Sequence, residues 1–148
     1  MSVRLATPAD LRQLLDMARA MHAESVYRHL AYDEGKMAAN FVKWMEDSDV
    51  CVFLYGKGQR SALAFFVGCA GPHFFGSDCG AWDKLFYARP EARGGLAAFR
   101  LFQAFVGWAK GQGALDVWPG VTSGSPAAEN FYRRLGCERV GALFRVPL

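Results

Sequence analysis

Three apolar segments follow one another in the middle of the chain, and the short connections between them limit the folds that are available. The segments are 50–55, 61–70 and 81–88. The turn signal Gly56-Lys57-Gly58 follows the first of them, and the connection 71–80 separates the other two. Both connections suit a hairpin, so we expect antiparallel neighbours in this part of the sheet.

Helical patterns flank these strands. Thr7-Pro8-Ala9-Asp10 is typical of a helix start, because Thr7 can cap, Pro8 suits the first turn and Asp10 suits the positive end of the helix dipole. The helix ends near Ser25, and a second one begins near Asp33. The other predicted elements are a first strand at 2–6, a helix at 95–110, a strand at 115–118, a helix at 127–135 and a final strand at 140–146.

The order of elements is therefore β-α-α-β-β-β-α-β-α-β, which mixes hairpins with βα crossovers. It predicts an α/β (α+β layered) fold with a mixed, mostly antiparallel central sheet of about six to seven strands, flanked by about four helices. The length of 148 residues suits a single domain, 1–148. The apolar fraction of 52% excludes a disordered chain.

Charge and hydropathy exclude several functions. The formal net charge of +3, from 17 basic and 14 acidic residues, is too small to indicate a DNA-binding surface. The N-terminus lacks a secretory pattern, and the most apolar stretch, 62–70, is too short to cross a bilayer as a helix. We expect no nucleic-acid partner, no membrane association and a cytoplasmic location.

The four cysteines predict neither a metal site nor a disulfide framework. They form no CxxC pair, and no histidine lies at metal-ligand spacing from two of them. Reduced thiols that act as small apolar side chains suit a cytosolic protein. The cysteines are Cys51, Cys69, Cys79 and Cys137.

The segment 87–98 is the most informative for function. A buried strand runs into a loop with Arg89 and Arg93, then the pair Gly94-Gly95, then a helix. The glycines let the backbone approach a ligand, and the first N–H groups of a helix attract anions. The same pair could instead serve only to turn the strand into the helix.

A second segment, 127–137, predicts a helix with one polar aromatic residue beside its buried face. Tyr132 lies next to the apolar positions Ala128, Phe131 and Leu135. A phenol in a cleft can act as a general acid toward a leaving thiolate. A tyrosine at the edge of the core is the alternative.

Together and in this order, the two segments resemble the GNAT superfamily of N-acyltransferases, and the whole chain fits that plan. Segment 89–98 is similar to its acetyl-CoA signature R/Q-x-x-G-x-G/A, with Arg93 in first place. Leu96 stands at the first glycine of that signature and Ala98 at the second glycine or alanine. Segment 128–137 is similar to the closing motif A-x-x-[FL]-Y-x-x-x-G-F, with Cys137 in place of Phe.

Further details are similar to a branch of the family found in phage and bacterial genomes. These are an Arg-Gly-Gly run followed by small residues, and the pair Glu24-Ser25 after the first helix. The resemblance implies acetyl transfer from acetyl-CoA to a primary amine of a small molecule or peptide by direct attack, without a metal. It also implies that a homodimer could form through the C-terminal strand.

The resemblance assigns roles residue by residue. A strand would pair with the pantetheine amides, and a backbone N–H of Tyr87 or Ala88 would polarise the thioester carbonyl. Tyr132 would protonate the departing thiolate. The strand residues are Phe86, Tyr87 and Ala88, and the residues at the CoA pyrophosphate are Arg93, Gly94, Gly95, Leu96, Ala97 and Ala98.

The general base for the amine has three candidates, besides a water relay. Asp83 lies on the strand where family members often carry an acid, Glu24 follows the first helix, and His73 has a suitable intrinsic pKa. For each, a solvent-exposed side chain is the alternative. At the level of the whole protein, the rival functions are a non-catalytic acyl-CoA sensor or scaffold and a partner-binding domain.

Overall fold

The computed structural model describes all 148 residues, and its centre is a five-stranded mixed sheet in the order β1-β2-β3-β4-β5. The first four strands are antiparallel to their neighbours, and β5 runs parallel to β4. This confirms the predicted α/β class and the predicted hairpins. The strands are β1 Ser2–Leu5, β2 Val50–Gly56, β3 Ala62–Pro72, β4 Cys79–Ala88 and β5 Asp116–Trp118.

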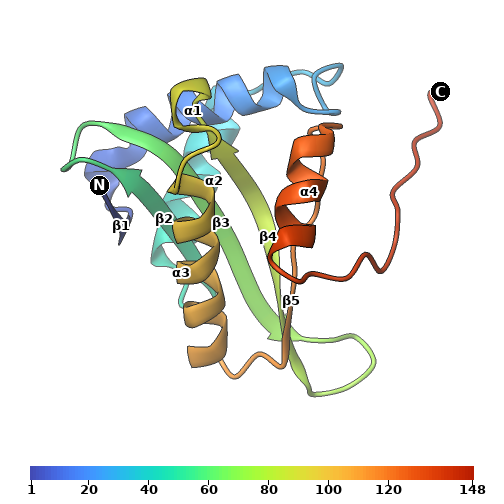
Figure 1. Cartoon of the computed structure of the whole chain (residues 1–148). Helices are drawn as coiled ribbons and strands as arrows, with labels where there is room; N and C mark the ends of the chain where they lie inside the picture. The colour runs from blue at the N-terminus through green and yellow to red at the C-terminus, as the bar shows by residue number, and fades with distance from the viewer.

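Four α-helices cover the two faces of the sheet (Figure 1). Two of them pack on one face and α3 packs on the other, while α4 lies beside β5. Phe65 and Phe66 on β3 point to opposite faces and enter the two cores, as strand alternation requires. The helices are α1 Leu11–Glu24, α2 Glu34–Glu46, α3 Ala97–Gly111 and α4 Pro126–Arg134.

A buried ion pair ties β1 to the start of α1. Asp10 is 1% exposed, and its two oxygens accept hydrogen bonds from Arg4 at 2.7 Å each. The Thr7 N–H and the Gln13 amide donate to the same carboxylate at 2.8 and 2.6 Å. The Arg4 guanidinium holds the pKa of Asp10 at about 2, although burial opposes this. The helix start predicted from Thr7 and Asp10 is therefore a capping box, and it opens with a short 3-10 turn, Pro8–Asp10.

The predicted final strand at 140–146 is wrong, and the sheet has five strands rather than six or seven. Gly136, with φ +80°, ends α4, and the chain then leaves the body of the molecule (Figure 1). Side chains of this tail such as Leu143 and Phe144 are 80% and 90% exposed. An alternating pattern makes a strand only where a neighbouring strand edge accepts its hydrogen bonds, and the tail meets none.

Candidate active site

Strand β4 continues past β5 and leaves part of one edge free. β5 pairs only with Gly80, Ala81 and Trp82 of β4. From Asp83 to Ala88, β4 keeps its neighbour β3 but has none on the other side, and Figure 1 shows β4 and β5 separating there. Backbone groups on such an edge can pair with an extended ligand.

A β-bulge at Lys84 decides which side chains point toward α3. The register skips this residue, between Asp83 and Leu85. Ala81, before the bulge, packs in the core on the α3 side, whereas Leu85, after it, packs on the α1 and α2 side. Bulges re-aim side chains in this way. Asp83 therefore lies on the face of the sheet that also carries Tyr132.

A cavity of about 900 Å³ opens beside the free edge of β4. This volume lies within the usual range for small-molecule sites, about 300–1,000 Å³. Its walls come from β4, the end of α1, the loop before α3, the loop 120–125 and α4. The sequence-predicted residues that line it are Glu24, Asp83, Phe86, Tyr87, Ala88, Arg93, Gly94, Gly95, Ala98 and Tyr132.

The loop between β4 and α3, residues 89–96, is where the sequence predicts an anion site, and we call it the anion loop. Gly94 has φ +77°, a conformation that favours glycine. No side chain caps α3, whose N-cap residue is Leu96, so the first N–H groups of the helix are free for an anion. Leu96 itself is 58% exposed and Ala97 is buried in the core, so neither side chain lines the cavity. Any contact from these two residues comes from the backbone.

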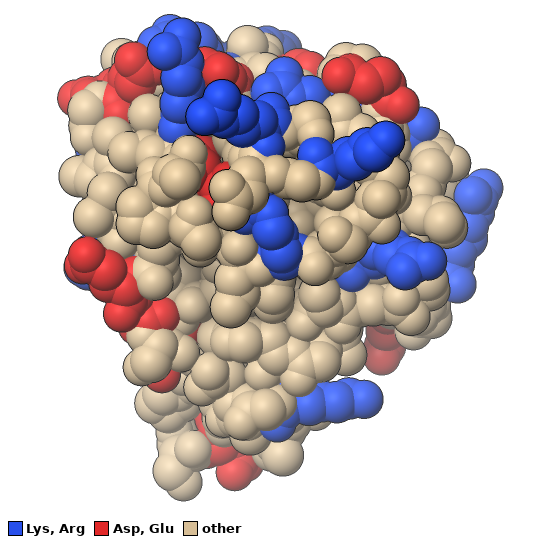
Figure 2. Space-filling model, turned by 90° about the vertical axis from the view of Figure 1, so that its left-hand side faces the viewer, with Lys and Arg blue, Asp and Glu red and all other residues tan.

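Charged side chains of both signs lie on the surface near the upper end of the molecule. Figure 2 shows Lys and Arg side chains over the upper half of one face, with Asp and Glu side chains among them at the top. Arg93 lines the cavity, and Arg89 donates to the Ala62 carbonyl at 3.2 Å. Of the charged side chains that line the cavity, three are basic (Lys84, Arg93 and Arg134) and two are acidic (Glu24 and Asp83), so the basic excess there is small.

Asp83 stands at the point where β4 and β5 separate. Its Oδ1 accepts a hydrogen bond from the Gly120 N–H at 2.9 Å. Burial raises the pKa of Asp83 to about 6, and the Gly120 hydrogen bond opposes this only in part. A carboxylate with this pKa can take up a proton near neutral pH.

Tyr132, on α4, lines the cavity and is buried against two phenylalanines. Its ring lies 5.6 Å from that of Phe102 and 5.2 Å from that of Phe131, and the residue is 8% exposed. Burial, followed by the negative charge of Asp83, raises the pKa of Tyr132 well above its ordinary value. The phenol is therefore protonated at neutral pH and can donate a proton in the cavity.

The backbone of Ala88 faces the free edge of β4. The next N–H, that of Arg89, bonds to the Leu63 carbonyl on β3, while the Ala88 carbonyl accepts from Arg93 Nε at 2.9 Å. Because successive residues in a strand present their backbone groups to alternate sides, the Ala88 N–H is open to a ligand and the Tyr87 N–H is directed to β3. Of these two predicted donors, the geometry favours Ala88.

Glu24 lines the cavity but is already engaged. Its Oε2 accepts a hydrogen bond from Arg93 Nη2 at 2.6 Å, and its Oε1 accepts one from the Tyr87 hydroxyl at 3.3 Å. Burial and then the Glu24 charge raise the pKa of Tyr87. Both carboxylate oxygens therefore already accept a hydrogen bond from another side chain.

His73 does not reach the cavity. It packs against Trp82 and Trp118, with ring centroids 5.1 and 5.9 Å away, and its Nε2 lies 3.8 Å from Asp116. These contacts place it at the far end of the β3–β4 hairpin. The geometry therefore does not favour it as the base.

Sequence reasoning missed the residues that α1, its following segment and the 120–125 loop bring to the cavity. His22, Tyr27 and Tyr32 line it. The Nε2 of His22 is buried without a hydrogen-bond partner, and its ring lies 5.4 Å from that of Tyr32. The Gly/Ser/Pro-rich composition of 120–126 was the one available signal for the loop that meets Asp83.

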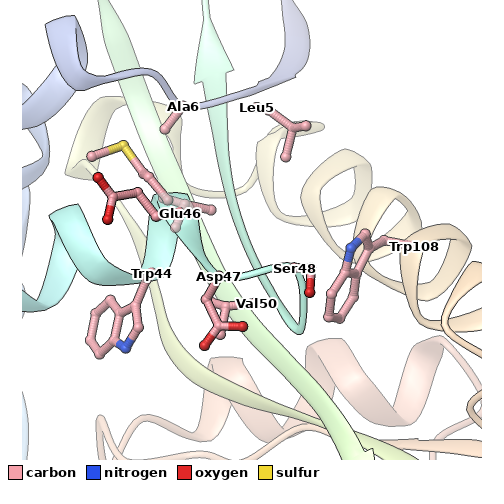
Figure 3. A pocket seen from close by; sticks show the side chains of 10 residues that line it. Leu5, Ala6, Trp44, Glu46, Asp47, Ser48, Val50 and Trp108 are labelled. Atoms are coloured by element: carbon pink, nitrogen blue, oxygen red, sulfur yellow. The ribbon is translucent and has the colours of Figure 1, made fainter.

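A second hollow, of about 300 Å³, lies near the beginning of β2 (Figure 3). Figure 3 shows Leu5, Ala6 and Trp108 around it, together with Ser48 from the turn before β2. None of the residues predicted for catalysis or for CoA lines this hollow, so the larger cavity is the candidate site.

No group of three or more His, Cys, Asp or Glu side chains is placed to hold a metal ion, and no helix has the length and apolar character needed to span a membrane. The four cysteines are all free.

The sheet, the separated strands and the uncapped start of α3 together define an α/β domain with a cavity beside the free edge of β4. The chain belongs to the acetyltransferase (GNAT) family, whose model matches residues 11–137. A search of curated proteins gave no match.

Several solved structures have a similar fold. A transcriptional regulator from Bacillus halodurans C-125 is 18% identical, with 99% of each chain covered and a TM-score of 0.83. A putative acetyltransferase from Agrobacterium tumefaciens str. C58 is 17% identical, with 100% of each chain covered and a TM-score of 0.80. The aminoglycoside antibiotic 6'-N-acetyltransferase AAC(6')-IG from Acinetobacter haemolyticus is 13% identical, with 100% of this chain and 98% of that chain covered and a TM-score of 0.80. At these identities the likeness concerns the fold alone.

Proposed function

We propose that this protein transfers an acetyl group from acetyl-CoA to a primary amine by direct attack, without a covalent enzyme intermediate. The observation that carries the proposal is that Asp83 and Tyr132 face one cavity, beside the free edge of β4 and the uncapped start of α3. Family membership supports acetyl transfer, and the proposal adds acetyl-CoA as the donor and a primary amine as the acceptor.

The residues at the cavity fit a donor that combines phosphates with an amide-bearing arm. Arg93 and the free N–H groups at the start of α3 would hold the pyrophosphate through charge and backbone donors. The free edge at Phe86 and Ala88 would pair with the amides of the pantetheine arm. Leu96 at a signature position is tolerated in this scheme because its contribution is made by the backbone.

Bound acetyl-CoA supplies the thioester carbonyl carbon that the amine nitrogen attacks and the sulfur that leaves. A backbone N–H on the free edge of β4 would donate to the carbonyl oxygen as negative charge grows on it. Asp83 accepts the proton that the amine loses as the C–N bond forms. Tyr132 gives its proton to the sulfur as the C–S bond breaks, and proton exchange with solvent then restores both side chains.

The rival function is a non-catalytic acyl-CoA sensor or scaffold with the same fold. Both functions require CoA binding, so CoA at a hundred times its dissociation constant should stabilise the folded chain by about 2.7 kcal/mol. Thiol release from acetyl-CoA over a panel of primary amines separates them. An enzyme releases thiol with some amine and loses this activity in Asp83→Asn, whereas a sensor is stabilised by CoA but releases none.

We further propose a small-molecule or peptide amine as acceptor, no nucleic-acid or membrane partner, and a cytoplasmic location that suits the free cysteines. The assignment to a phage or bacterial branch is part of the same proposal. The exposed apolar tail, with Val140, Leu143 and Phe144, supports a homodimer, because such side chains gain stability when a partner covers them. Sedimentation of the full chain beside a chain lacking 140–148 tests this, and a homodimer requires that only the shorter chain sediments as a monomer.

A further inference from the structure

The ion pair between Glu24 and Arg93 joins the end of α1 to the loop before α3, and both segments line the cavity. Glu24 is the last residue of α1, and Arg93 directly precedes the Gly94-Gly95 pair of the anion loop. Their side chains are 46% and 45% exposed and meet at 2.6 Å. Both residues line the cavity, so a ligand in it can reach either of them.

Three contacts hold the Arg93 side chain in its present place. Its Nη2 donates to Glu24, its Nε donates to the Ala88 carbonyl, and its guanidinium carbon lies 5.5 Å from the centre of the Tyr87 ring. The Ala88 carbonyl, which accepts this hydrogen bond, faces the free edge of β4. In this position Arg93 covers the end of the edge that the proposed donor would use, and its guanidinium is bound to a carboxylate rather than free for a phosphate.

The Glu24 carboxylate competes with a phosphate ligand for the Arg93 guanidinium. Phosphate and carboxylate both form strong paired hydrogen bonds with a guanidinium, so they compete for the same donors. An exposed ion pair of this kind is weak enough to exchange partners.

From this geometry we propose that Glu24 is a positioning residue whose ion pair with Arg93 is exchanged when the donor binds. The pyrophosphate of CoA takes over the guanidinium, and Glu24 is released as an unpaired carboxylate at the end of α1. The inference rests on the proposed function, because it takes CoA as the ligand. It gives Glu24 a role other than that of a base. It also couples CoA binding at the loop before α3 to the part of the cavity that α1 lines.

The test is the affinity of the full chain for CoA, measured by calorimetric titration at fixed ionic strength. Glu24→Gln keeps the shape of the side chain and can still accept from Tyr87, but it removes the charge that holds Arg93. We expect this variant to bind CoA about two- to fivefold more tightly than the wild type, which corresponds to the strength of exposed ion pairs. In an Arg93→Gln background, Glu24→Gln should leave the affinity unchanged, because the two residues then no longer interact.

Glu129→Gln is the matched control. Glu129 forms an exposed ion pair with Arg133 within α4 at 3.6 Å. Glu129→Gln changes the net charge of the chain by the same amount as Glu24→Gln does. Its variant should bind CoA like the wild type. Equal gains in both variants, or a gain from Glu24→Gln that persists without Arg93, would show a general charge effect and overturn the exchange.

The same titration separates this inference from the proposed function. If wild type and Glu24→Gln bind CoA equally, or if the variant binds more weakly, the exchange is wrong while the CoA site stands. If the wild type shows no CoA binding at millimolar concentration, the proposed function fails and the exchange fails with it.

Discussion

Two aspartates in this chain are withdrawn from solvent, Asp10 fully and Asp83 in part, and they have opposite properties. Asp10 receives hydrogen bonds from Arg4, Thr7 and Gln13, and its pKa is lowered to about 2. Asp83 receives one backbone hydrogen bond, from Gly120, and its pKa is raised to about 6. A carboxylate surrounded by donors stays charged and stabilises the fold, whereas one that lacks them can change its protonation near neutral pH.

The comparison separates residues that hold the fold from residues that perform chemistry. The Arg4–Asp10 pair joins β1 to α1 at a distance from the cavity, and neither residue lines it. Asp83 lines the cavity and is placed there by the bulge in β4. Substituting each aspartate by asparagine should therefore affect different measurements.

The largest effect is expected from Asp83→Asn on activity. Loss of a general base lowers kcat/KM by about 100- to 10,000-fold. The same change should raise the free energy of unfolding at pH 8, by up to about 3 kcal/mol, because it removes a carboxylate that is costly to ionise where it stands. Thiol-release assays and urea unfolding measure the two effects.

Asp78→Asn, on the exposed β3–β4 connection, is the control and should change neither quantity. An Asp83→Asn variant that is both fully active and less stable than the wild type would remove the distinction between the two aspartates.

Asp10→Asn should act on stability. It leaves Arg4 without its charged partner and breaks the bidentate contact, which should lower the free energy of unfolding by roughly 2–4 kcal/mol. The value of kcat/KM should stay near that of the wild type at a temperature where the variant is folded. Asp16→Asn, on the exposed face of α1, serves as the control for an added asparagine in that helix.

The pH dependence of stability should show both aspartates with opposite signs. The ordinary pKa of an aspartate is 3.8. Because the pKa of Asp10 is lowered, its stabilising contribution is present above about pH 4 and is lost as the pH falls toward 2. Because the pKa of Asp83 is raised, its contribution is complete below about pH 4 and is lost as the pH rises through 6.

Urea unfolding between pH 2 and pH 8 tests these signs. Asp10→Asn should flatten the low-pH limb, and Asp83→Asn should flatten the limb between pH 4 and pH 6. A wild-type curve that rises throughout the second interval, and is unchanged in Asp83→Asn, would contradict the raised pKa.

The smallest effect is expected from Arg4→Lys. Lysine keeps the positive charge but cannot make both hydrogen bonds to Asp10, so the loss should be about 1 kcal/mol. Arg12→Lys, on the exposed surface of α1, should lower the free energy of unfolding by less than about 0.5 kcal/mol, as is usual for surface substitutions. Thermal unfolding monitored by circular dichroism resolves this difference, and equal losses in the two variants would show that the bidentate geometry adds nothing.

Local signals in the sequence predicted most elements of the fold. Thr7, Pro8 and Asp10 marked the beginning of the first helix, and Gly56-Lys57-Gly58 marked the end of a strand, because caps and turns depend on neighbouring residues. The tail at 140–146 shows the limit of such reasoning. Its alternation is real, but a strand also needs a partner edge, and that is a property of the whole sheet.

The candidate site was predicted in part for the same reason. The anion loop and Tyr132 lie in local motifs, and the resemblance of these motifs to the GNAT family brought them forward as candidates. The bulge at Lys84, the ion pair between Glu24 and Arg93, and the contact of Gly120 with Asp83 join segments far apart in the chain. Sequence alone left the base undecided because the pKa of Asp83 depends on its burial in the fold and on the Gly120 hydrogen bond.

The pH profile of kcat/KM tests the central claim most directly, once thiol release has identified an acceptor amine. If Asp83 is the base, activity rises with pH through an apparent pKa of about 6, and this limb is absent from the residual activity of Asp83→Asn. A limb of unchanged position and height in Asp83→Asn would contradict the account.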